Sequence, residues 1–141
     1  MKAHDLIHDG LYLIGDSQIV RFYALNGAFY TLDDDFFGNP FEKAESGEIE
    51  CFTINKNWLI ISPIPLTPEI LGKNGWVTDG HTWWRNDEGF SISGEYYRRK
   101  SGEPLYISIT GEATCDLNHV HTLQHALRLC GLHDLADNFK V

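Results

Sequence analysis

The sequence ISPIPLTPEILGKNGW, at residues 61–76, separates two parts of the chain that differ in character. Pro63 and Pro65 exclude this segment from a central strand or a helix interior, because proline has no backbone N–H to donate. Thr67 is a good helix N-cap, and Pro68 follows at the first helical position, where the missing N–H has no cost. The stretch therefore predicts an extended joint and then a helix of about two turns, which needs tertiary packing to be stable.

The residues before the joint predict several short strands. Asn26-Gly27 lies between two β-prone runs and is typical of a two-residue hairpin turn of type I′. That turn would place Tyr23 opposite Tyr30. Further strands are expected within residues 5–16 and at residues 48–54 and 58–64.

Residues 33–47 predict a long polar loop, since they contain Gly38, Pro40 and Gly47. Three of its side chains either fold back onto the strands or form an exposed aromatic lip: Phe36, Phe37 and Phe41. Asp33-Asp34-Asp35 can supply carboxylate oxygens to a divalent ion. A solvated turn is the alternative there, because consecutive strand-end side chains do not all point one way.

The residues after the joint predict a three-stranded antiparallel meander, with strands at residues 81–85, 90–97 and 105–110. Apolar and polar residues alternate in the last strand, beginning at Leu105, so one face of the sheet is apolar. A helix over residues 118–130, with Asn118 as its N-cap, should cover that face. Its apolar stripe consists of Val120, Leu123, Leu127 and Cys130, and we expect contacts with Ile92, Ile107 or Ile109.

Together these patterns predict an α+β fold with two subdomains. Residues 1–65 would form an N-terminal small SH3-like β-barrel, because about five short strands with tight connections favour that architecture. Residues 66–141 would form a helix, the three-stranded antiparallel sheet and a covering C-terminal helix.

The composition narrows the class of function. The chain has 141 residues, 43% of them hydrophobic, and a net charge of −9, so it can bury a core but is a poor general nucleic-acid binder. No apolar run approaches the roughly 18 residues of a membrane span, and residues 1–10 lack the apolar segment of a secretory signal. The three cysteines have no C-x-x-C spacing. We therefore expect a cytoplasmic protein with free thiols that does not bind membranes.

Two motifs carry a resemblance. One is PIPLTPEIL at residues 63–71, followed by Gly75-Trp76, and the other is VHTLQHAL at residues 120–127. Together they resemble a group of small uncharacterised proteins of Bacteroidetes phages and mobile elements. In that group a P-I-P-L-T-x-E-I-L segment precedes a short β region and a C-terminal V-H-x-L-Q helix. His121, Leu123 and Gln124 match the helix motif. The resemblance implies a mobile-element setting and brings no known activity.

A group of histidines lies in the last helix. His121 and His125 are four residues apart, the spacing by which one helix face presents two metal ligands. Other ligand types lie close in the sequence: Cys115, Asp116, His119, His133 and Asp134. No Glu follows His121 as in H-E-x-x-H, so a zinc hydrolase is not indicated. The alternative is a polar stripe in which His121 and Gln124 form hydrogen bonds to neighbouring segments, and we expect no metal and no cofactor.

The one basic run of this acidic chain is Arg98-Arg99-Lys100, which follows Tyr97 at a predicted hairpin end. Trp83-Trp84-Arg85 lies on the neighbouring predicted strand. Aromatic faces stack on bases, and arginine pairs with phosphate or carboxylate, so this patch would suit a small anionic ligand. The alternative is a solvated turn that protects a sheet edge.

These observations favour a non-catalytic binding protein that holds a host protein or a small anionic, nucleotide-like ligand. A counter-defence protein that sequesters such a ligand is one version. The expected ligand-binding residues are Trp83, Trp84, Arg85, Tyr97, Arg98, Arg99, Lys100, His121 and Gln124. The alternative function is a metal-dependent enzyme that uses His121 and His125. The sequence leaves the oligomeric state open.

Overall fold

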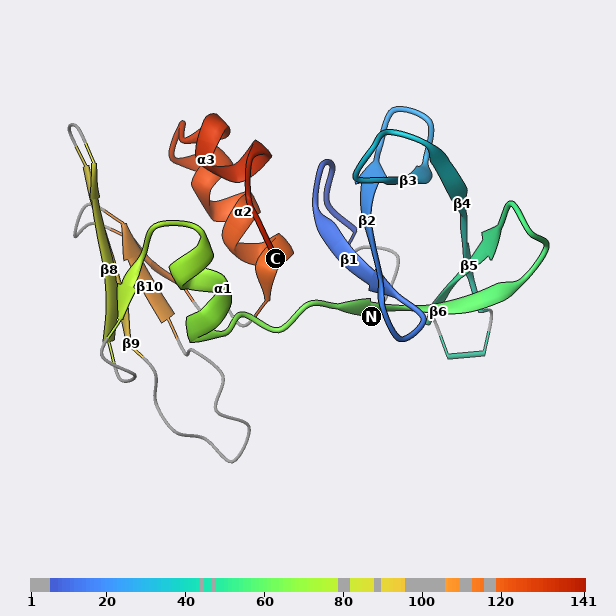
Figure 1. The fold of residues 1–141 in the computed structure, drawn as a ribbon, viewed down its shortest axis with the longest axis horizontal. Helices are drawn as coiled ribbons and strands as arrows, with labels where there is room; N and C mark the ends of the chain where they lie inside the picture. The colour runs from blue at the N-terminus through green and yellow to red at the C-terminus, as the bar shows by residue number, and fades with distance from the viewer. Residues whose placement is uncertain are drawn as a thin grey trace. The chain divides into compact units, whose positions relative to one another are not determined.

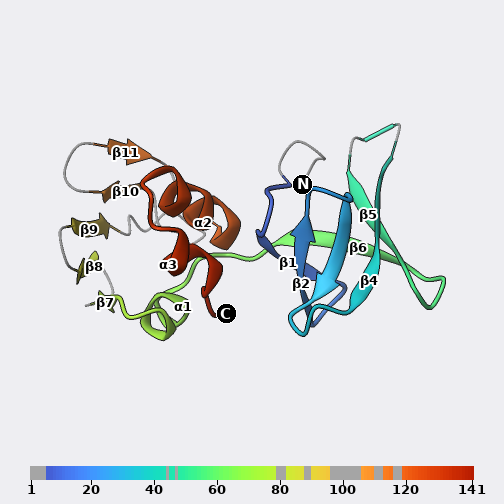
Figure 2. The same cartoon turned by 90° about the horizontal axis from the view of Figure 1, so that it is seen from above.

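The computed structural model describes residues 6–43, 45–46, 48–78, 82–87, 90–95, 106–109, 113–115 and 119–141. The chain divides into two compact units, Met1–Ile64 and Pro65–Val141 (Figures 1 and 2). The first unit contains a closed antiparallel β-barrel, and the second contains a sheet with helices. The expected α+β fold with a small barrel is therefore confirmed. No helix in the described ranges is both long and apolar enough to cross a membrane.

The barrel has six strands, each antiparallel to the next. The strands are β1 (Leu11–Ile14), β2 (Gln18–Tyr23), β3 (Ala28–Thr31), β4 (Phe36–Glu42), β5 (Ile49–Thr53) and β6 (Trp58–Pro63). β6 returns to β1, with Tyr12 opposite Pro63 and Ile14 opposite Ile61. Closure pairs every strand on both sides, so the barrel presents no free sheet edge.

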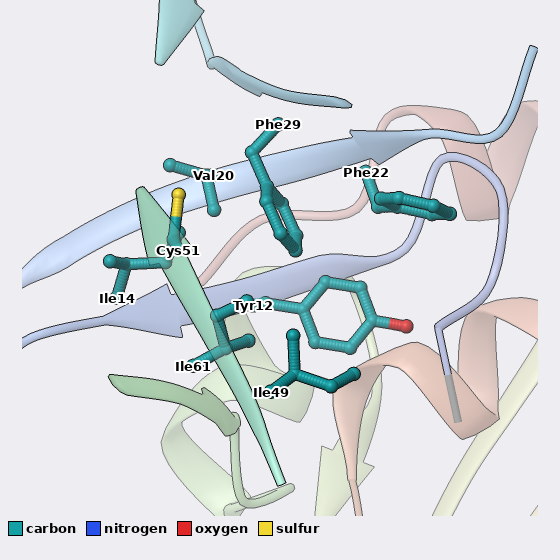
Figure 3. Close-up of a cluster of buried hydrophobic side chains, with 8 residues drawn as sticks. All are labelled: Tyr12, Ile14, Val20, Phe22, Phe29, Ile49, Cys51 and Ile61. Atoms are coloured by element: carbon teal, nitrogen blue, oxygen red, sulfur yellow. The ribbon is translucent and has the colours of Figure 1, made fainter. Parts of the chain in front are cut away.

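The barrel encloses its own apolar core, which Figure 3 shows. The buried side chains are Tyr12, Ile14, Val20, Phe22, Phe29, Ile49, Cys51 and Ile61. The rings of Phe22 and Phe29 lie 5.4 Å apart, and the Tyr12 hydroxyl accepts a hydrogen bond from the Ile7 N–H at 2.7 Å. The hydroxyl group of this buried tyrosine therefore has a hydrogen-bond partner, as burial requires.

The connection between β2 and β3 differs from the predicted hairpin. Phe22 lies opposite Phe29 and Tyr23 opposite Ala28, so four residues connect the strands and not two. A type I′ turn needs a positive φ at both central residues, whereas only Gly27 has one here, at 64°. The register is shifted by two residues, which keeps every side chain on the same face. The rings of Tyr23 and Tyr30 therefore still meet, with centroids 6.1 Å apart.

The loop predicted at residues 33–47 is wrong, because β4 occupies its centre. Gly38 is required in this strand: a Cβ there would collide with the Phe52 carbonyl group and lie 2.7 Å from the Cys51 Sγ. Glycine in a strand can mark such a close approach of backbones, although it also resembles a loop signal. Phe37 packs against the core, whereas Phe36 and Phe41 are exposed. One of the three phenylalanines therefore folds back onto the strands, and the other two are exposed.

The second unit has a five-stranded sheet in the order β11-β10-β9-β8-β7. Its elements are α1 (Pro68–Lys73), β7 (Val77–Thr78), β8 (Thr82–Asp87), β9 (Phe90–Glu95), β10 (Tyr106–Ile109), β11 (Ala113–Cys115), α2 (Val120–Leu129) and α3 (His133–Asp137). The three predicted strands correspond to β8, β9 and β10. The sequence missed the edge strands β7 and β11, because two or three residues are too few to show an alternating pattern.

The helix after the joint forms as the sequence predicts. The Thr67 Oγ1 accepts a hydrogen bond from the Ile70 N–H at 3.2 Å, and Pro68 opens the helix. At the other end Gly75 has a φ of 83°, and the Trp76 N–H donates to the Leu71 carbonyl oxygen at 3.0 Å. This is the Schellman ending. Leu71 is fully buried, so the short helix has the tertiary packing that it needs.

α2 lies over one face of the sheet in both views (Figures 1 and 2). Val120, Leu123 and Leu127 are fully buried, as their spacing predicts. The N-cap is His119 and not Asn118, which lies outside the described residues. Cys130, the C-cap residue of α2, is exposed and does not belong to the buried stripe. The side chains of Ile92, Ile107 and Ile109 and the whole of Leu105 lie outside the described part, so the predicted contacts with them are untested.

Candidate functional site

The predicted basic patch lies largely outside the structure. Tyr97, Arg98, Arg99 and Lys100 are not among the described residues. Trp83, Trp84 and Arg85 belong to β8, where the backbone of Trp84 pairs with Val77 on one side and with Ser93 on the other. The Trp84 side chain is exposed, whereas the side chains of Trp83 and Arg85 are not described. The anionic-ligand site therefore remains an expectation from the sequence.

The residues of the helix motif point into the second unit. His121 is 5% exposed and Gln124 only 1% exposed. The Gln124 Nε2 donates to the Ala136 carbonyl oxygen at 3.0 Å, which ties α2 to α3. The His121 ring stacks on that of His119, with centroids 5.7 Å apart. The amide of Gln124 thus has an internal structural partner.

The alternative metal site would need His125 beside His121. His125 is exposed although His121, one turn away, is buried. Within the described ranges no three His, Cys, Asp or Glu side chains gather in the way that metal ligands do. Asp116 and the Cys115 side chain lie outside those ranges. Asp33, Asp34 and Asp35 are exposed in the turn before β4, where the Asp35 N–H donates to the Thr31 Oγ1 at 3.1 Å.

The outer surface of β4, β5 and β6 carries an exposed group of aromatic and apolar side chains. We call Phe41, Phe52, Trp58 and Ile60 the aromatic face. The Trp58 ring lies 5.3 Å from that of Phe41 and 4.9 Å from that of Phe52, centroid to centroid. Phe41 is 51% exposed, Trp58 53% and Ile60 64%. Two neighbouring rings are thus exposed to solvent, and the partly buried Phe52 ring packs beside Trp58.

Strand register explains why these side chains share one surface. Phe41 pairs with Glu50, which pairs with Ile60, and Phe52 pairs with Trp58. Successive residues of a strand point to opposite faces, so Ile49, Cys51 and Ile61 fill the core while their neighbours face outward. The rings are therefore held on three paired strands of a closed barrel.

A hollow of about 250 Å³ adjoins the aromatic face. Its lining consists of Phe41, Glu42, Lys43, Glu50 and Trp58. The Lys43 Nζ lies 2.7 Å from the Glu50 Oε1, and this hydrogen bond, together with the carboxylate charge, raises the pKa of Lys43. Aromatic rings and charges of both signs thus meet at one small depression.

A second hollow, of about 350 Å³, lies in the second unit near the end of α1. Its lining consists of Lys73, Asn74, Gly75, Trp76, Asp134, Leu135, Asn138 and Lys140. The Asn74 side chain forms two hydrogen bonds with the backbone of Lys140, one donated and one accepted, both 2.7 Å long. It also donates to the Ile70 carbonyl oxygen at 2.8 Å. These bonds fasten the last residues to α1, which is a structural role.

The sequence contains a signal for the aromatic face that strand prediction alone does not use. Residues 58–61 read Trp-Leu-Ile-Ile, so the positions on both faces of this strand are apolar. In a closed barrel only one face of each strand points into the interior, so two of these four side chains must point outward. No protein-family model, no curated protein and no solved structure matches this chain.

Proposed function

We propose that this protein is a non-catalytic binding protein that holds a host protein against its aromatic face. The observation that carries the proposal is the cluster of neighbouring rings in which Phe41 and Trp58 are half-exposed and Phe52, packed against Trp58, is partly buried. Contiguous exposed apolar surface on a soluble domain usually marks an interaction site. Tryptophan and other aromatic residues are also enriched in the energetic centres of protein interfaces.

The setting of this function comes from the sequence. Resemblance to phage and mobile-element proteins favours a partner in the host cell, and counter-defence is the version we propose. Free thiols at Cys51 and Cys130 support a reducing, cytoplasmic environment. We also propose that the barrel is SH3-like, which the meander of short strands and the pairing of β6 with β1 support.

Two other versions have less support among the described residues. A metal-dependent enzyme would use His121 and His125, of which the first is buried and the second exposed. Sequestration of a small anionic ligand relies on Arg98, Arg99 and Lys100, for which no geometry is described. For the aromatic face, by contrast, the structure describes both the side chains and their neighbours.

The test is the capture and reconstitution of a defined complex. Tagged protein would be used to isolate partners from a Bacteroidetes lysate, and each candidate would then be purified and titrated against the parent and Trp58→Ser proteins. We expect a stoichiometric complex whose affinity falls at least tenfold in the variant, because a tryptophan that becomes buried in an interface is a frequent hot spot.

The matched control is Leu25→Ser, which removes a side chain that is 82% exposed in the β2–β3 connection and is not part of the aromatic face. This control should bind as the parent does. Equal affinity of Trp58→Ser and the parent for the purified partner would refute the proposed interface. Failure of every purified candidate to form a complex would refute the proposed function.

A further inference from the structure

The hollow beside Trp58 has the size of a side-chain pocket. At about 250 Å³ it is smaller than the roughly 300–1,000 Å³ of typical small-molecule sites. Two aromatic residues, Phe41 and Trp58, and two acidic residues, Glu42 and Glu50, are among the residues that line it. An occupant therefore meets aromatic surface and negative charge together.

Rings and carboxylates together select a cation. The faces of aromatic rings attract ammonium and guanidinium groups, with tryptophan the best of the ring types. The surroundings are acidic as well: residues 1–65 carry 4 basic and 10 acidic side chains, a net charge of −6. A positively charged group is thus favoured both at contact and at longer range.

Lys43 shows that a cation fits this position. Its ammonium group lies 2.7 Å from the Glu50 carboxylate, and about half of its side chain is exposed. Exposed ion pairs of lysine contribute little to stability, so exchange of this ammonium for another cation has a low cost. Lys43 and Glu50 both line the hollow, so the Glu50 carboxylate already has a cationic partner there.

Arginine suits the hollow better than lysine does. A guanidinium group is planar, so it can stack on the Trp58 ring and also form two parallel hydrogen bonds with the Glu50 carboxylate. An ammonium group can form only a point contact with the same carboxylate. Ile60 and Phe52, which extend the surface next to Trp58, would then be covered by apolar residues on either side of the arginine.

We infer that the partner presents an arginine between apolar residues, and that this arginine enters the hollow and displaces Lys43 from Glu50. The inference rests on the proposed function, because it names the chemistry of the partner at the same surface. It specifies a basic and apolar protein segment as the occupant.

A capped synthetic peptide of alternating arginine and leucine is the probe. Its binding to isotope-labelled protein would be followed through backbone amide resonances, in parallel with peptides that carry lysine or glutamine in place of arginine. We expect the largest shifts in β4, β5 and β6 near the hollow. Affinity should decrease from arginine to lysine to glutamine, and should fall with added salt because the attraction is partly electrostatic.

Two variants test the exchange with Lys43. Lys43→Ala removes the internal partner of Glu50 and should tighten arginine-peptide binding at least threefold, whereas Glu50→Gln should weaken it about tenfold. The charge-matched controls are Lys56→Ala and Asp16→Asn, exposed residues of the same barrel that do not line the hollow. They change the overall charge equally and should alter affinity much less.

Several outcomes would overturn the inference. Equal binding of the glutamine peptide would show a purely apolar surface, and a Lys43→Ala effect no larger than that of Lys56→Ala would exclude the exchange. Concentration-dependent dimerisation of the parent, lost in Trp58→Ser, would assign the surface to a second copy. A host protein that binds through Trp58 but is insensitive to Glu50→Gln would leave the proposed function standing and remove the arginine. If the arginine peptide binds but no host partner is found, the preference of the hollow for arginine would stand and the proposed function would fall.

Discussion

Cys51 shows how the interior of the barrel acts on a single ionisable group. Its side chain is fully buried in the core, and burial raises the pKa of the thiol from 9.0 to about 11. The thiolate is disfavoured there because an apolar interior cannot solvate its charge. The residue therefore behaves as a small apolar side chain at neutral pH, and it is a poor nucleophile while the barrel is closed.

We predict that the barrel loses stability as the pH rises from about 9 to about 11. Over this range the unfolded chain releases the Cys51 proton while the folded chain retains it, so ionisation favours the unfolded state. The full shift corresponds to at most about 2.7 kcal/mol. Urea denaturation at several pH values, with Cys51→Val as the control for other titrating groups, measures it. The parent should decline more steeply than the variant, and equal slopes would contradict the assignment.

At the same scale, the sequence indicated only part of the candidate site. Phe41 stood out as a possible exposed ring, but Trp58 did not, because an apolar run such as residues 58–61 is also typical of a strand buried on both faces. Barrel closure decides between the two, since it leaves one face of β6 outside. Closure is a property of paired strands far apart in sequence, Tyr12 with Pro63 for example, and no local pattern contains it.

Among the elements, α2 was predicted well in its middle and at its C-terminus, where Cys130 is the C-cap, and less well at its N-terminus. The 3.6-residue period identified Val120, Leu123 and Leu127 as buried, because spacing alone fixes which side chains share a helix face. The first residue of the helix depends on local side-chain hydrogen bonds that the period does not contain. The Thr122 hydroxyl donates to the His119 carbonyl oxygen at 2.7 Å, which makes His119 the N-cap. At the other end Gly131 has a φ of 80°, and the Leu132 N–H donates to the Leu127 carbonyl oxygen at 2.9 Å.

We predict that the same truncation to alanine has very different effects on stability at two leucines of α2. Leu127 is fully buried, whereas Leu129 is 75% exposed on the same helix. Truncation of Leu127 to alanine should lower the free energy of unfolding by about 2–5 kcal/mol, through lost burial and the cavity that remains. Leu129→Ala removes the same atoms from solvent and should cost less than about 0.5 kcal/mol. Chemical denaturation of both variants measures the difference, and similar losses would contradict the burial assigned to α2.

β4 shows the opposite case, an element that local signals concealed. Gly38 and Pro40 both predicted a loop, yet Gly38 is needed where β4 crosses closest to Phe52, and Pro40 lies opposite Cys51. The presence of glycine and proline in a sequence does not show whether they end a strand or occupy it where two backbones come close together. Tertiary contact, and not propensity, decided this element.

At the scale of the whole molecule, the barrel contains everything that its core requires. All eight core side chains lie between Tyr12 and Ile61, and every strand has both of its neighbours within the first unit. The aromatic face is carried by the same strands. The proposed binding surface is therefore built by residues 1–64 alone.

We predict that a fragment of residues 1–64 folds and retains the aromatic face. Domains of about 60 residues bury only about 60% of their surface and are marginally stable, so the fragment should melt at a lower temperature than larger domains but in one cooperative transition. A fragment of residues 1–57 is the control, because without β6 both β1 and β5 lose a partner strand. It should remain unfolded in circular dichroism under the conditions in which the longer fragment folds. An unfolded 1–64 fragment would show that the barrel core is insufficient. A folded one that binds the arginine–leucine peptide as the whole chain does would place the binding surface within the first unit.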